Sequence, residues 1–129
     1  MYNAFRECGW AAWLCLLIGF AGSGVGLVGV VLLAAKQRGA AMGAGVIAVA
    51  LGALAMGAGV VGQQSGLSRM EAALSGTSID PSQKERIRAV GTLEASRCIS
   101  VGAGTGALPF LLGAVAVGLG LALRKQPAA

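Results

Sequence analysis

The sequence predicts an all-α membrane protein with three transmembrane helices and a partly helical polar loop between the second and the third. Two observations support this prediction: the chain is 56% hydrophobic and only 12% charged, and the few charged residues gather in short clusters. A soluble domain carries about 25% charged residues, so too little polar surface remains here to coat a soluble globule. We therefore expect lipid to surround most of the chain.

Three windows of the sequence contain no Asp, Glu, Lys or Arg. They are residues 8–35, 39–68 and 98–123. A helix needs about 20 residues to cross roughly 30 Å of hydrocarbon, and each window exceeds that length. The sequence predicts a single membrane domain over residues 1–129, with spans at about 10–35, 40–62 and 99–123 and a polar loop at 63–98.

The first span has the features of a retained signal anchor. Its apolar character continues through Leu33, well beyond the roughly 7 to 15 apolar residues of a cleaved signal peptide. We expect Trp10 and Trp13 at one membrane interface, while Lys36 and Arg38 hold the other end among the lipid headgroups. The second span is rich in Ala and Gly and is expected to insert as a hairpin with the first.

The third span contains Pro109 and ends at Arg124 and Lys125. Proline removes a backbone donor and clashes with the preceding turn, so we expect a kink near Thr105 or Gly106. The Thr105 hydroxyl is a candidate to bond the carbonyl that the proline frees. We interpret this residue as a tolerated membrane-helix proline rather than a gating hinge.

Small residues recur four positions apart in all three spans. Lipid tails are as apolar as leucine, so membrane helices associate through the close backbone approach that small side chains permit. We predict tight packing, either within the chain or between copies. The predicted helix-packing positions are Gly22, Gly26, Gly52, Gly57, Gly102, Gly106 and Gly118.

The polar segment 63–98 is expected to hold two short helices. Ser68 with Glu71 three residues later matches a capping box, and Gly76 can end that first helix. Asp80 followed by Pro81 is the start signal of the second. Only Gly91 interrupts the pattern after that point, so one long helix from Pro81 into the membrane is the alternative.

No catalytic, cofactor or metal site is expected. The chain has no histidine, which removes the commonest general base and metal ligand. Cys8, Cys15 and Cys98 lack CxxC spacing and are interpreted as small apolar residues near helix ends. The spans contain no ionisable residue that would mark an ion path. We therefore expect no enzyme activity, no bound cofactor and no nucleic-acid partner.

One stretch of the third span resembles a known family. The run from Ala107 through Leu108, Pro109, Phe110, Leu111 and Leu112 to Gly113 is similar to the proline-containing helix of the MotA/TolQ/ExbB proton-channel family. In that family the proton-carrying acid belongs to a partner subunit. The resemblance covers about one span, and it implies an accessory or degenerate relative.

By elimination, the sequence favours a non-enzymatic small multi-pass membrane protein that serves as a packing or assembly subunit of a membrane complex. The alternative is a subunit of an ion- or solute-conducting complex, and a phage-type holin ranks third. The expected partners are the lipid bilayer and other membrane helices, in a homo-oligomer or hetero-complex. The expected location is the cell membrane, specifically a bacterial inner membrane. Six basic residues lie on one side of the spans and four on the other, so the positive-inside rule favours a cytoplasmic N-terminus and loop.

Overall fold

The computed structural model describes residues 8–76 and 80–124. These residues form three α-helices: α2 (Trp10–Ala34), α3 (Arg38–Leu74) and α4 (Pro81–Arg124). All three are long and apolar enough to cross a membrane. The predicted all-α class with three candidate transmembrane helices is therefore confirmed.

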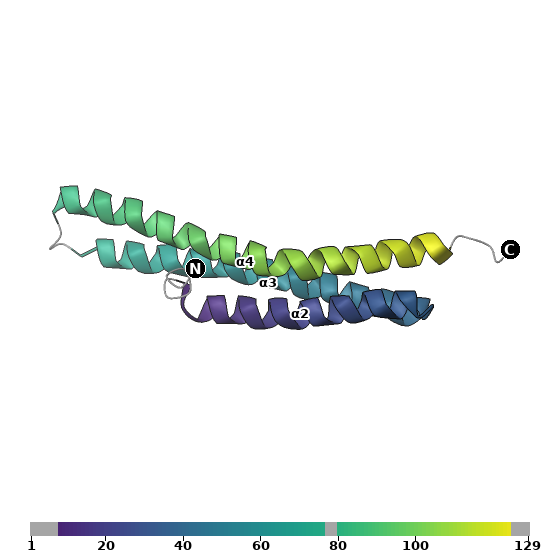
Figure 1. The fold of residues 1–129 in the computed structure, drawn as a ribbon. Helices are drawn as coiled ribbons and strands as arrows, with labels where there is room; N and C mark the ends of the chain where they lie inside the picture. The colour runs from purple at the N-terminus through teal and green to yellow at the C-terminus, as the bar shows by residue number, and fades with distance from the viewer. Residues whose placement is uncertain (1–7, 77–79, 125–129) are drawn as a thin grey trace.

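The helices run up, down and up, so that α2 and α4 are parallel and α3 is antiparallel to both (Figure 1). Contacts between α2 and α3 run in opposite directions, since Gly62 lies against Ala11 while Gly29 lies against Ala41. Between α2 and α4 the numbers rise together, from Gly19 against Thr105 to Gly26 against Leu112. The part of α4 beside α2 extends from about Cys98, which is bonded to Cys8, to Gly120, which lies next to Leu33.

The prediction of a polar loop at 63–98 with two short helices is wrong. α3 does not end at Gly62 but continues to Leu74, and the Ser68 hydroxyl donates to the carbonyl of Ser65 at 3.1 Å rather than capping a new helix. Pro81 does begin a helix, as predicted: the Asp80 carbonyl accepts from the backbone N–H of Gln83 and of Lys84, each at 3.0 Å. That helix continues unbroken into the third span, which was the alternative.

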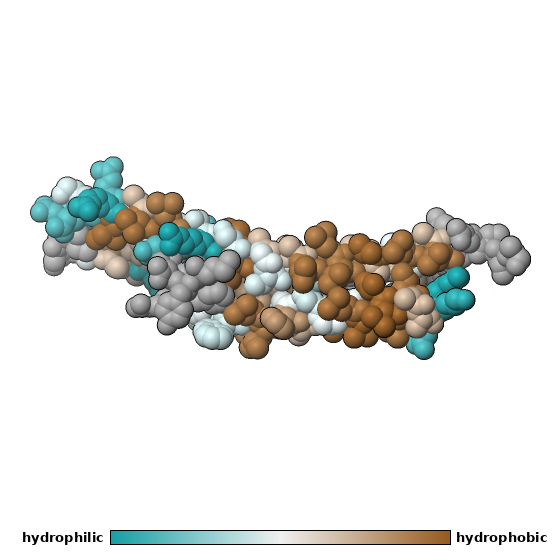
Figure 2. All heavy atoms as spheres, in the orientation of Figure 1, coloured by the Kyte–Doolittle hydropathy of each residue, from teal (hydrophilic) through white to brown (hydrophobic). Residues whose placement is uncertain are grey.

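The polar segment is therefore an antiparallel helical hairpin that prolongs two of the spans. At 1.5 Å per residue, α2 is about 37 Å long, whereas α3 and α4 are about 55 and 66 Å long. The excess projects beyond the start of α2 (Figure 1). In Figure 2 the visible surface mixes hydrophilic and hydrophobic residues over this projecting end and carries a small hydrophilic patch at the opposite end, with a mainly hydrophobic stretch between them. A bilayer fits the hydrophobic stretch and leaves the hairpin in water.

The bundle keeps its small residues inside and its large ones outside. The buried apolar residues of the described chain are mostly alanine, such as Ala41, Ala48 and Ala55, which are fully inaccessible. Large side chains point outward: Phe20 is 82% exposed and Leu17 is 67% exposed. In water this arrangement would expose an extensive apolar surface, and in lipid it places bulky side chains against acyl chains.

Candidate functional site

The face of each helix that points into the bundle carries small residues in steps of three and four. The steps alternate in α2 and α3, and in α4 they alternate except for two successive steps of four at Cys98, Gly102 and Gly106. This spacing has a period of seven, the repeat of helices that wind around each other in a left-handed supercoil. We call these three rows the inner seams. The buried positions are Ala12, Cys15, Gly19, Gly22, Gly26 and Gly29 on α2; Ala41, Gly45, Ala48, Gly52, Ala55, Gly59 and Gly62 on α3; and Ala95, Cys98, Gly102, Gly106, Pro109, Gly113, Ala116 and Gly120 on α4.

Where α3 meets α4, glycine faces glycine and the two backbones touch. A Cβ atom on Gly52 would lie 2.8 Å from the carbonyl oxygen of Gly106, and one on Gly106 would lie 2.6 Å from the carbonyl oxygen of Gly52. Gly59 and Gly102 form a second reciprocal pair, in which a Cβ on Gly102 would lie 2.8 Å from the Gly59 Cα. Such an approach places Cα–H groups against carbonyl oxygens, a weak attraction of about 0.5 to 1 kcal/mol per contact. No side chain larger than hydrogen fits at these four positions.

Pro109 lies in the seam between α2 and α4, where it is among the most deeply buried side chains. Its ring stands over Gly22, with 2.9 Å between the Pro109 Cβ and the position of a Cβ on Gly22. The carbonyl freed by a proline belongs to the residue four positions earlier, here Thr105. That oxygen lies 2.7 Å from the Cβ position of Gly19, so the backbone of α2 occupies the place of the lost hydrogen-bond donor.

The predicted role of the Thr105 hydroxyl is therefore wrong in detail. It donates to the carbonyls of Val101, at 2.8 Å, and Gly102, at 3.3 Å, in the turn below. The freed oxygen is Thr105's own carbonyl, which a side chain on the same residue does not reach. α4 remains helical through Pro109 and bends near the middle of its length (Figure 1).

The seven predicted packing glycines fall into two groups. Gly22, Gly26, Gly52, Gly102 and Gly106 lie in the inner seams, and a Cβ at any of them would come within 3.0 Å of another helix. Gly57 and Gly118 are exposed, and nothing lies within 4 Å of their Cβ positions. These two glycines take no part in packing within the chain.

Small residues four apart also occur on the outer surface, around the two exposed glycines. On α3, Ala53 and Gly57 are both exposed, and on α4, Ala114, Gly118 and Ala122 are exposed. We call these two rows the outer small stripes. They have the same spacing as the small-residue motifs that bring membrane helices together, and no part of the described chain covers them.

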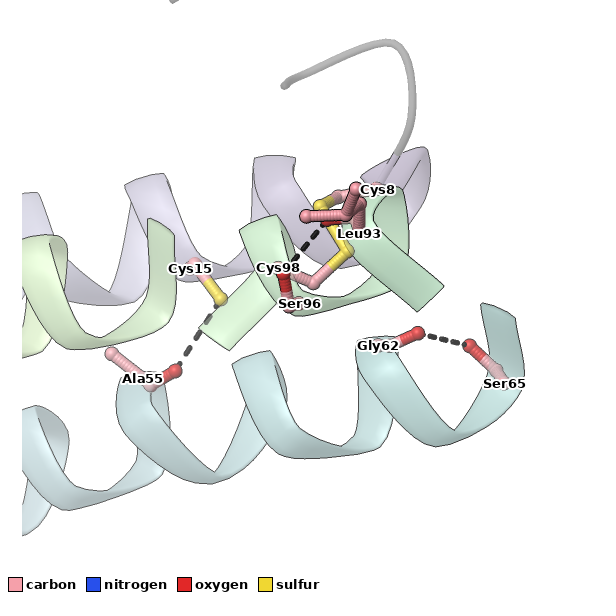
Figure 3. The surroundings of a disulfide bond; sticks show 8 residues. All are labelled: Cys8, Cys15, Ala55, Gly62, Ser65, Leu93, Ser96 and Cys98. Carbon is pink, nitrogen blue, oxygen red and sulfur yellow. Dashed lines mark hydrogen bonds between the residues drawn. A yellow bond between two sulfur atoms is a disulfide. The ribbon is translucent and has the colours of Figure 1, made fainter. Parts of the chain in front are cut away.

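Cys8 and Cys98 form a disulfide that ties the start of α2 to α4, with Cα atoms 5.5 Å apart and a sequence separation of 90 (Figure 3). Their interpretation as separate small apolar residues did not anticipate this link. The third cysteine, Cys15, has a free thiol, is buried, and donates to the carbonyl of Ala55 at 3.3 Å. Cys15 was expected as a small apolar residue near a helix end, and it lies within the first two turns of α2 in the contact with α3.

A cleft of about 720 Å³ opens beside the disulfide, where α3 and α4 emerge past the start of α2. Both bridged cysteines line it. Its walls are mixed, with Trp10, Met70, Ile87 and Val90 among the apolar side chains and Arg69, Gln83, Arg86 and Glu94 among the polar ones. The volume is in the range of small-molecule pockets, although the mixed lining converges on no single polar group.

At the opposite end of the bundle, a basic residue links the start of α3 to the end of α4. The turn between α2 and α3 contains Lys36 in a left-handed conformation, with φ of 62°. Arg38, the first residue of α3, donates from Nη1 to the carbonyl of Leu123 at 3.0 Å. This bond satisfies one of the last carbonyls of α4, which would otherwise meet the membrane surface without a partner.

Within residues 8–76 and 80–124, no group of three His, Cys, Asp or Glu residues could hold a metal ion, and no polar or charged side chain is buried. The chemistry that the described residues offer is helix contact, one disulfide and one free thiol. Comparisons with protein-family models, curated proteins and solved structures find no match to this chain.

Proposed function

We propose that this protein is a non-enzymatic assembly subunit of a membrane complex, in which its outer small stripes bind other transmembrane helices. The observation that carries the proposal is that the bundle is complete without these stripes. The chain uses its inner seams to pack its own helices, yet α3 and α4 still present closely spaced small residues to the lipid. A partner helix would gain close backbone contact there.

A second observation supports the same proposal at the membrane surface. The hairpin carries an exposed apolar row on α4, where Val90 and Leu93 are 54% and 67% exposed and Ile87 is 41% exposed. These residues lie in the part of α4 that extends beyond the start of α2, so a bilayer that covers the three-helix part of the bundle would not cover them. An apolar row in water is typical of a protein contact.

Conduction of ions or solutes is the second candidate that the sequence left open. In the described residues the interior of the bundle consists of touching small residues and contains no buried polar or charged side chain. A conducting role would therefore need a partner subunit to supply the polar groups. The resemblance of the segment around Pro109 to the MotA/TolQ/ExbB family is compatible with such a partnership, but the assembly proposal explains more of the surface.

The test is purification in mild detergent with chemical cross-linking in the membrane before extraction. We expect wild type to yield a cross-linked homo-oligomer or a defined complex with another membrane protein. Gly57→Leu and Gly118→Leu should reduce its yield at least several-fold while leaving the thermal unfolding of the chain unchanged. Gly24→Leu is the matched control, since Gly24 is also exposed with nothing within 4 Å but lies beside the bulky, exposed Phe20 and Leu27. A monomer with no cross-linked species, or equal yields in all four proteins, would refute the proposal.

A further inference from the structure

We infer that the Cys8–Cys98 disulfide reports the orientation of the chain in its membrane: the bridged end and the projecting hairpin face an oxidising compartment, and the turn at 35–37 faces the cytosol. This inference does not depend on the proposed assembly role. It rests on which compartment allows the bond to persist.

The two cysteines are placed for a bond without movement of the helices. Their Cα atoms are 5.5 Å apart, within the usual range of about 4.4 to 6.8 Å for disulfides. The parallel course of α2 and α4 brings them together, because Cys8 lies two residues before Trp10 and Cys98 lies where α4 comes level with α2. The pair is therefore a product of the fold itself.

Both bridged cysteines line the cleft. Cys8 is partly exposed whereas Cys98 is 5% exposed, so the bond is approached from the side of Cys8. In the oxidation, the thiolate of one cysteine attacks the disulfide of a thiol–disulfide exchange protein and forms a mixed disulfide with it. The second thiolate then attacks the sulfur of the first cysteine, so that the intramolecular S–S bond forms. The exchange protein leaves as a dithiol that carries the two electrons and both protons.

The same access determines where the bond survives. Cytosolic glutathione and thioredoxin keep accessible thiols reduced, while secretory, periplasmic and extracellular compartments maintain disulfides. A bond beside an open cleft would therefore be broken on the cytosolic side. The cleft and the exposed row of Ile87, Val90 and Leu93 consequently belong to the oxidising side.

The charges at the two ends give a mixed signal. Among the described residues, the end with the 35–37 turn holds Lys36, Arg38 and Arg124 and no acidic residue, while the hairpin end holds five basic and four acidic residues. Basic residues alone, five against three, favour a cytosolic hairpin under the positive-inside rule. That excess of two is a small bias, whereas reduction in the cytosol acts on every accessible disulfide. The disulfide therefore determines the inferred orientation. It places the hairpin on the oxidising side, whereas the positive-inside rule favoured the cytosolic side.

Cysteine labelling in intact bacterial cells tests the orientation. In a Cys15→Ala background that keeps the disulfide, Ser75→Cys places a thiol at the exposed end of α3 and Gln37→Cys places one in the exposed turn at the other end. We expect a membrane-impermeant maleimide to label Ser75→Cys in intact cells and Gln37→Cys only after permeabilisation. The reverse pattern, or equal labelling of both in intact cells, would overturn the inference.

The bond itself is counted separately. Cells are quenched and denatured in N-ethylmaleimide, so that the buried Cys15 thiol is also blocked. Excess reagent is removed, and the chain is then reduced and treated with a polyethylene-glycol maleimide. We expect two added groups on wild type and none on a Cys8→Ser/Cys98→Ser double variant, with Cys15→Ala identical to wild type. Wild type with no added group would show both cysteines reduced in the cell and would overturn the inference. A failure of the oligomerisation test leaves both of these results unaffected.

Discussion

At the scale of single residues, the surroundings of each glycine determine what it does. Gly52 and Gly57 lie five residues apart in the same Ala- and Gly-rich span of α3. A Cβ on Gly52 would collide with the backbone of α4, at 2.8 Å from both the Gly106 oxygen and the Phe110 nitrogen, whereas a Cβ on Gly57 meets nothing. Because backbone atoms on a packed helix have little room to retreat, the first position tolerates only hydrogen.

We expect Gly52→Ala to lower the free energy of unfolding in detergent by about 1 to 3 kcal/mol, the usual cost of forcing an added methyl group into a packed interior. Gly57→Ala should cause no loss, since the methyl group points into lipid and alanine favours the helix by up to about 1 kcal/mol. Thermal or denaturant unfolding followed by circular dichroism measures both. Equal effects of the two substitutions would contradict the inner seam.

Pro109 is a second position where the contact, not the residue type, decides the effect. Pro109→Ala restores a backbone N–H that could bond the Thr105 carbonyl, which in isolation would strengthen the helix. It also removes the ring that stands over Gly22 and favours a straighter α4, drawing the Thr105 oxygen away from Gly19.

We expect Pro109→Ala to destabilise the bundle by about 1 to 3 kcal/mol, because the cavity and the lost helix contact outweigh the regained hydrogen bond. The measurement is the unfolding midpoint in detergent, with Leu108→Ala as control, since Leu108 is 57% exposed. A more stable Pro109→Ala protein would show that the proline is only tolerated in α4, as the sequence suggested, and does not support its packing.

At the scale of elements, the main difference from expectation is the length of α3 and α4. The capping box at Ser68 and Glu71 predicted a helix start, yet the chain was already helical there. A cap is useful only where the N–H groups of a first helical turn lack partners. No proline lies between Gly62 and Ser68, and Gly66 alone does not end the helix. The hydroxyl of Ser68 then turns back to the Ser65 carbonyl, as serine does within helices.

A proline at position 68 distinguishes the two arrangements. We expect Ser68→Pro to cost about 3 kcal/mol and to make the hairpin susceptible to protease, because proline removes a hydrogen bond and clashes inside a continuous helix. Limited proteolysis in detergent, with mapping of the cut sites, checks this, and Ser68→Ala is the matched control. If Ser68 began a separate helix, proline there would be tolerated and the cleavage pattern would not change.

At the scale of the whole molecule, one covalent link joins the beginning of the described chain to the third span. It closes a loop of about 90 residues around α2, α3 and the start of α4. Such a closure restricts the unfolded chain and stabilises the native bundle relative to it. The helix contacts and the disulfide therefore stabilise the same parallel arrangement of α2 and α4.

Reduction of the disulfide should lower the free energy of unfolding in detergent by roughly 2 to 5 kcal/mol. The measurement compares thermal unfolding with and without a phosphine reductant. The Cys8→Ser/Cys98→Ser variant should match the reduced wild type and should not respond to the reductant. A response of equal size in that variant would trace the effect to Cys15 or to the reductant itself.

The cysteines and glycines show how much of the structure could be predicted from the sequence. The boundary positions of Cys8 and Cys98, each at the start of a span, contained the signal for a bridge, since the first and third spans of a three-span protein begin on the same side. The small residues of α3 from Ala41 to Gly62 likewise repeat in steps of four and three throughout. A spacing of four residues identifies both Gly52 and Gly57 as packing positions. Only the repeat of four and three shows that Gly52 belongs to the buried row and Gly57 does not.

The sequence by itself predicted that lipid surrounds this protein and that three helices could cross a bilayer. Uncharged stretches longer than about 20 residues have few alternatives to a membrane-spanning helix. Only the tertiary structure decided which small residues face inward, where the freed carbonyl of Thr105 lies, and that Cys8 meets Cys98. These depend on the rotation and relative depth of each helix. In lipid both are set by close backbone contact between helices rather than by a polar and an apolar face, so neither is apparent from composition alone.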